Sequence, residues 1–144
     1  MNIEEMKKIV SQLESKEIEY KQSIAEIDKL GQAICGFLNA DGGKGFIGVT
    51  DKQQIVGIEV TESTKQKMAN FCNHFDPWPE LNIEYIPLKD SDKQVVVITA
   101  TPRSDKMPFT YRGTPYLRNE DSRQKMPAEI YKKRLLESAR LVPQ

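Results

Sequence analysis

Cysteine, histidine and long apolar stretches are scarce in this sequence, and each scarcity excludes a class of protein. The 144 residues include two cysteines, Cys35 and Cys72, and one histidine. Two thiols without a secretory pattern favour free cysteines in a reducing cytosol over a disulfide-stabilised fold. The longest purely aliphatic run, VVVI at 95–98, is too short to cross a bilayer. The first residues, MNIEEMKKIV, have no apolar signal core. We therefore expect a cytoplasmic protein that does not enter a membrane.

Several catalytic and cofactor motifs are also missing. His74 is the single possible base for a Ser/His/Asp triad, and no nucleophile-elbow motif accompanies it. Cys72 and His74 could supply two zinc ligands, but structural zinc sites usually take four, so a core thiol and a surface histidine are favoured. The loop NADGGKGFIG at 39–48 follows a predicted helix, whereas the loop of a P-loop protein precedes one. A helix C-cap and a tight turn explain its glycines, and we expect no nucleotide cofactor.

Net charge is zero, but the charges are unevenly distributed. Residues 101–144 contain ten Lys/Arg and five Asp/Glu, a net charge of +5, which leaves −5 for residues 1–100. The C-terminal third is therefore suited to a polyanion, and the rest of the chain to a cation or metal. A split of this size also arises often by chance.

The pattern of apolar residues predicts one α+β domain over residues 1–144. The helical spacing of apolar residues and the capping-box spacing of Ser23 and Glu26 predict helices at about 6–14, 23–38, 61–75 and after Pro127. Alternating or β-rich segments predict strands at about 17–21, 45–49, 54–58, 81–88, 94–101, 109–112 and 115–118. We expect these elements to form a mixed β-sheet of about six strands with helices packed on it.

Three carboxylates could form a metal site. Glu19 and Lys21 should share one face of the strand at 17–21, Glu14 should fold over that face, and Asp51 follows a glycine-rich strand. Carboxylates that meet need a cation or a proton between them, and hard ions such as Mg²⁺ or Mn²⁺ prefer oxygen ligands. Glu14, Glu19 and Asp51 are thus the candidate metal ligands and, with Lys21, the candidate catalytic residues. The alternative is a solvated charged face, since Glu-x-Lys occurs elsewhere in the chain.

The segment FTYRGTPYLRNEDSRQK at 109–125 interleaves arginines with tyrosines. Arginines can fork onto phosphates while aromatic rings stack on bases. Tyr116 and Arg118 should share one face of a strand. The candidate nucleic-acid contacts are Lys21, Arg112, Tyr116, Arg118 and Arg123. The alternative is that tyrosine and arginine occupy an ordinary edge strand.

Together these segments resemble the Schlafen AlbA-type domain (AlbA_2), formerly grouped with divergent AAA-type transcriptional regulators. The resemblance rests on ESKEIEYK, AICGFLNADGGKGFIGVTD, IVGI and GTPYLRNEDSRQKMPAEIY, and it covers the chain from about residue 13 to residue 135. It implies an α+β, nucleic-acid-binding domain that is often the N-terminal part of a longer regulator.

In the Schlafen branch the resemblance also implies a Mg²⁺- or Mn²⁺-dependent endoribonuclease acting on structured, tRNA-like RNA. Here Glu14, Glu19 and Asp51 match its three acids, and Lys21 matches its lysine. The chain departs from that branch because it has one lobe where Schlafen enzymes use two, and it lacks a full Cys/His zinc set. Three hypotheses follow: a DNA- or RNA-binding regulatory domain that acts as a homodimer, a metal-dependent endoribonuclease, and a non-enzymatic dimerisation module.

Overall fold

The computed structural model describes residues 1–105, 107–120 and 122–141. Its helices are α1 (Ile3–Val10), the 3-10 turn η1 (Ile24–Glu26), α2 (Ile27–Leu38), α3 (Glu62–Cys72) and α4 (Ala128–Leu141). Its strands are β1 (Ile18–Lys21), β2 (Gly43–Ile47), β3 (Phe75–Asp76), β4 (Glu80–Pro87), β5 (Gln94–Thr101), β6 (Thr110–Tyr111), β7 (Thr114–Asn119) and β8 (Ser122–Lys125). The predicted α+β class is confirmed.

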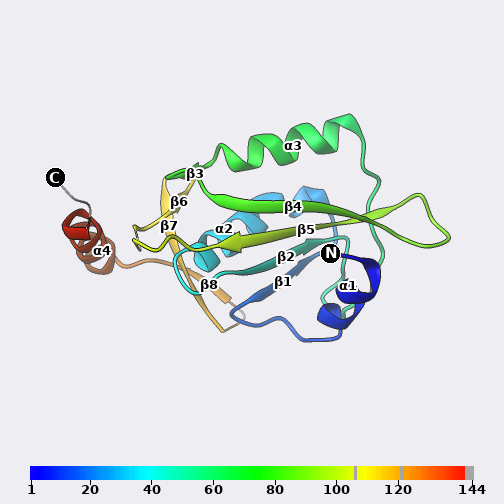
Figure 1. Cartoon of the computed structure of the whole chain (residues 1–144), viewed down its shortest axis with the longest axis horizontal. Coiled ribbons are helices and arrows are strands. Elements are labelled where there is room, and N and C mark those ends of the chain that lie inside the picture. The colour runs from blue at the N-terminus through cyan, green and yellow to red at the C-terminus, as the bar shows by residue number, and fades with distance from the viewer. Residues whose placement is uncertain (106, 121, 142–144) are drawn as a thin grey trace.

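The strands form two four-stranded sheets, where the sequence pattern suggested one larger sheet. The first has the order β1-β2-β5-β4, and the second has the order β3-β6-β7-β8. Strands β1 and β2 are parallel, while the other pairings of named strands in the described residues are antiparallel. The first sheet is thus mixed, as predicted, and the second is a separate antiparallel unit (Figure 1).

Helix α2 connects the two sheets. It contacts β1, β2 and β5 of the first sheet and β6, β7 and β8 of the second. Eight of its twelve residues are buried, because sheets cover it on more than one side. At Gly36 an added Cβ would lie 2.9 Å from the Cβ of Arg118, so glycine lets β7 approach the helix closely. This approach is what brings the two sheets near enough to share side-chain contacts.

The N-terminal helix begins and ends earlier in the chain than predicted. Helix α1 ends at Val10, and a loop with a few turns leads to β1. Met6 and Val10 are buried in a small apolar cluster with Tyr20 and Phe46, separate from the larger cluster around α2. Because the helix ends early, Glu14 lies on the loop and can turn toward β1. None of the described helices is long and apolar enough to cross a membrane.

Three other segments differ from the prediction. Residues 54–58 form no strand, and Ile55 and Ile58 make isolated bridges to Val49 and Gln94. Strands β3 and β8 were missed, because β3 has two residues and the β8 sequence SRQK has no apolar residue. A polar edge strand carries no alternating pattern, so only its pairing with β7 reveals it.

Candidate functional site

A single tyrosine fixes the loop that carries Glu14. The Tyr20 hydroxyl donates a hydrogen bond to the carbonyl of Gln12 (2.5 Å), and its oxygen lies 3.2 Å from the carbonyl oxygen of Ile9. The Tyr20 backbone N–H donates to Glu14 Oε2 at 3.1 Å. This hydrogen bond holds the Glu14 carboxyl beside β1, close enough to Glu19 for the charge of Glu19 to help raise the pKa of Glu14. Two of the three predicted acids therefore meet.

Glu19 is buried and faces two cations. It is 5% exposed, an unusual position for an acid. Its Oε1 lies 2.9 Å from Lys21 Nζ, and its Oε2 lies 2.5 Å from Arg118 Nη1. The second contact is an ion pair without hydrogen-bond alignment, so Oε2 accepts no hydrogen bond from the described residues. Glu19 and Lys21 do share one strand face, as predicted, and that face points into the molecule.

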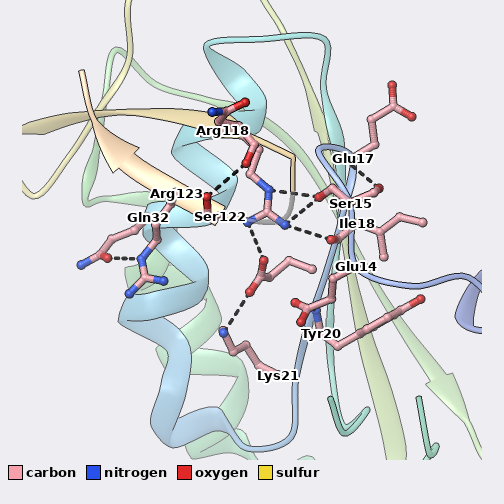
Figure 2. Close-up of polar contacts among 12 residues, drawn as sticks. Glu14, Ser15, Glu17, Ile18, Tyr20, Lys21, Gln32, Arg118, Ser122 and Arg123 are labelled. Atoms are coloured by element: carbon pink, nitrogen blue, oxygen red, sulfur yellow. Dashed lines mark hydrogen bonds and ion pairs between the residues drawn. The ribbon is translucent and has the colours of Figure 1, made fainter. Parts of the chain in front are cut away.

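Arg118 is an internal residue and does not lie on the surface. Its side chain is 1% exposed. It donates to the Ser15 carbonyl from Nε (3.1 Å) and Nη2 (2.7 Å), and to the Ile18 carbonyl from Nη2 (3.1 Å) (Figure 2). The guanidinium also lies 5.1 Å from the centre of the Phe37 ring. The predicted contact between Arg118 and a phosphate backbone therefore does not fit the structure: β7 directs this side chain across α2 to the start of β1.

Glu14 differs from Glu19 in its access to solvent. It lines a hollow of about 350 Å³ together with Ser15, Lys16 and Glu120. Burial raises the pKa of the Glu14 carboxyl from 4.5 to about 7, and the adjacent Glu19 adds to the rise, while the Tyr20 N–H and Lys21 oppose it. Glu14 is therefore near the midpoint of its titration at neutral pH, and a proton can reach it from the hollow.

Asp51 does not complete the predicted metal site. It is exposed, in a turn closed by a hydrogen bond between the Thr50 N–H and the Gln54 carbonyl (2.9 Å). In the parts of the chain that the structure describes, no group of three or more His, Cys, Asp or Glu residues could hold a metal ion. The pair of acids that does meet is faced by Lys21 and Arg118. As arranged, these residues do not fit a Mg²⁺ or Mn²⁺ site.

Arg112 lies in a second charged cluster, at the surface. Its Nε donates to Asp28 Oδ1 at 3.0 Å, and its Nη2 lies 3.1 Å from His74 Nε2. The Tyr111 hydroxyl donates to the same Asp28 oxygen at 2.6 Å. These hydrogen bonds, first that of Tyr111 and then that of Arg112, hold the pKa of Asp28 below its usual value. Arg112 is exposed, as a nucleic-acid contact requires.

Arg123 also contacts α2. Its Nε donates to Gln32 Oε1, and Figure 2 shows the two side chains meeting beside the helix. Tyr116 is partly buried and packs against the core, so its ring is not free in the way that a stacking platform needs. Asp28 and Gln32, which receive the two arginines, were not predicted, although they lie one turn apart at polar positions of the α2 pattern.

Comparison with known proteins identifies the family. The family model for Schlafen, AlbA_2 matches residues 14–127. The chain belongs to the Schlafen AlbA_2 family. The matched range begins at Glu14 and includes both charged clusters, while α1 and α4 lie outside it. No curated protein matches the chain.

The Schlafen AlbA_2 chain is also similar in structure to the DIP2311 protein from Corynebacterium diphtheriae, whose crystal structure is known. The TM-score is 0.58 at 15% sequence identity, and the match covers 83% of this chain and 23% of that chain. At this identity the likeness shows the fold alone. The chain spans less than a quarter of that protein's length. Membership of the Schlafen AlbA_2 family indicates a nucleic-acid-binding domain.

Proposed function

We propose that this domain binds nucleic acid through the exposed side of α2 and serves as the recognition domain of a transcriptional regulator. The observation that carries the proposal is that two predicted cationic contacts converge on one helix. Arg112, from the β6–β7 turn, binds Asp28, and Arg123, from β8, binds Gln32. Asp28 and Gln32 are four residues apart and share one helix face.

Further cations extend this surface. Lys29 is exposed on α2, and Lys125 is exposed on β8, where alternation places it on the same face as Arg123. We call Lys29, Gln32, Arg112, Arg123 and Lys125 the α2 face. Its four cations outnumber the one acid, Asp28, that pairs with it. A cationic strip of this kind suits the regular charges of a phosphate backbone and makes binding depend on salt.

The metal-dependent ribonuclease is the less favoured alternative. Its mechanism requires Glu14, Glu19 and Asp51 around one ion, and the described residues bring together the first two. The α2 face needs no metal, because four of its five residues are lysines or arginines that carry a positive charge at neutral pH.

Fluorescence anisotropy with labelled tRNA, single-stranded RNA and duplex DNA tests the proposal. The Lys29→Glu/Arg123→Glu variant reverses two charges of the α2 face. We expect its affinity to fall by about tenfold or more, and the slope of log K against log salt to become shallower by about two. The matched control is Lys65→Glu/Lys67→Glu, which reverses two exposed charges on α3.

Equal losses in the two double variants would show that general charge, and not the α2 face, determines binding. Each binding reaction is also run on a denaturing gel with MnCl₂ and with EDTA. Cleavage of RNA that requires Mn²⁺ and disappears in Glu19→Gln would favour the ribonuclease over the proposed binding domain. Light scattering of the same samples tests the predicted homodimer.

A further inference from the structure

The carboxylate pair beside α2 poses a problem of charge. Glu14 is held beside β1 by the Tyr20 N–H, near Glu19, and Glu19 is 5% exposed. An ionised acid at such a position is strongly destabilising unless a positive charge faces it. Either a bound ion or a residue of the chain must supply that charge.

The structure places an arginine in this position. Arg118 Nη1 lies 2.5 Å from Glu19 Oε2, and the Arg118 side chain is 1% exposed. Lys21 approaches the other oxygen, Oε1, at 2.9 Å from the more open side. Both oxygens of Glu19 therefore face cations of the chain itself, and the side chain that could most readily leave is Lys21, which is 15% exposed.

Arg118 is held in place independently of Glu19. Its Nε and Nη2 donate to two carbonyls at the start of β1, those of Ser15 and Ile18. Gly36 leaves room for β7 at this point, since an added Cβ would lie 2.9 Å from the Arg118 backbone nitrogen. The directional hydrogen bonds of the guanidinium thus go to the backbone, and its charge faces the acid. The arrangement is built from three separate segments of the chain.

We propose that Arg118 is the resident cation of the Glu14–Glu19 pair: it joins β7 of the second sheet to β1 of the first and takes the position that a divalent ion would otherwise occupy. The site then folds without metal. Arg118 is thus a positioning residue, because it fixes Glu19 and the 14–18 segment and does not itself contact nucleic acid.

Thermal unfolding with excess MnCl₂ and with EDTA tests this proposal. We expect the wild-type melting temperature to be the same in both. If the folded protein did bind the ion, a free ion concentration about a hundred times the dissociation constant would raise the melting temperature by several degrees. The Arg118→Met variant leaves Glu19 without its buried partner, so its melting temperature should fall by roughly 10 °C. Mn²⁺ should restore part of this loss, because the vacated position exposes carboxylate oxygens to it.

Two further variants keep the test decisive. Arg112→Met removes the exposed arginine of the same hairpin as a matched control, and its melting temperature should be unchanged by either additive. Glu19→Gln/Arg118→Met removes both charges, so it should be more stable than Arg118→Met and should not respond to Mn²⁺. A wild-type protein that is stabilised by Mn²⁺ and loses this response in Glu19→Gln would overturn the proposal, whether or not Arg118→Met folds.

Discussion

Two arginine–carboxylate clusters lie beside α2, and they differ in burial. In one, Arg118 faces Glu19 with side chains 1% and 6% exposed. In the other, Arg112 faces Asp28 with side chains 53% and 58% exposed. The contact distances are 2.5 Å for the first pair and 3.0 Å for the second. The two arginines are six residues apart in the sequence: Arg112 precedes β7, and Arg118 lies within it. Distance and residue type therefore do not distinguish them.

Burial decides what each cluster can do. An exposed pair contributes little to stability, because water and salt screen both charges whether or not they meet. Its arginine can exchange the carboxylate for a phosphate with little loss. A buried pair cannot be separated without leaving an unpaired charge in a medium of low polarity. The Arg118 cluster thus suits a structural role, and the Arg112 cluster suits recognition.

The largest effect that would sharpen this comparison is expected from Gly36→Ala. Alanine favours a helix over glycine by about 1 kcal/mol, so an unstrained site would gain stability. Here the new Cβ would lie 2.9 Å from both the Cβ and the backbone nitrogen of Arg118. We expect a net loss of about 1–3 kcal/mol, measured by urea unfolding, because β7 must move away from α2.

Gly113→Ala, beside Arg112, is the control for that measurement. An added Cβ at Gly113 meets no atom within 4 Å, although its φ of +83° disfavours alanine. The cost at Gly113 should therefore be the smaller of the two and should come from backbone conformation alone. A larger loss for Gly113→Ala than for Gly36→Ala would contradict the view that close packing around Arg118 holds the sheets together.

The sequence allowed part of this comparison to be predicted. Local patterns predicted the α+β class, α2 and the alternation that places Glu19 and Lys21 on one face. They did not predict which face is buried, because that depends on a second sheet whose edge strand, β8, is polar throughout. Arg118 was therefore predicted to be a surface residue, although the glycine at 36, which makes room for it, is visible in the sequence.

The two clusters should also respond to pH in opposite directions. The pKa of Glu14 is raised from 4.5 to about 7 in the folded protein, so the folded state binds a proton more readily than the unfolded chain. Its contribution to stability is therefore present at low pH and is lost as pH rises from about 4.5 to about 7. The urea midpoint should fall across this window in the wild type and stay level in Glu14→Gln.

Asp28 gives the reverse case. Its pKa is lowered by the hydrogen bonds from Tyr111 and Arg112, so its contribution is present at neutral pH and is lost as pH falls through its folded value. The Asp28→Asn variant should remove this loss of stability at acid pH. The fall in the urea midpoint between about pH 4.5 and 7, which comes from Glu14, should remain. If Glu14→Gln instead abolished both pH dependences, the one between about pH 4.5 and 7 and the one at acid pH, the two clusters would be coupled and would not act separately.

The smallest effect is expected at Arg112. Arg112→Gln keeps most of the side-chain length and removes one charge from the α2 face, so affinity for nucleic acid should fall several-fold and the salt slope should become shallower by about one. Its melting temperature should match the wild type, since the pair with Asp28 is exposed. Anisotropy titrations at several salt concentrations measure the slope, and the same samples give the melting temperature. A large loss of stability with an unchanged slope would assign Arg112 the structural role that we give to Arg118, and would leave Arg123 and Lys29 to account for binding.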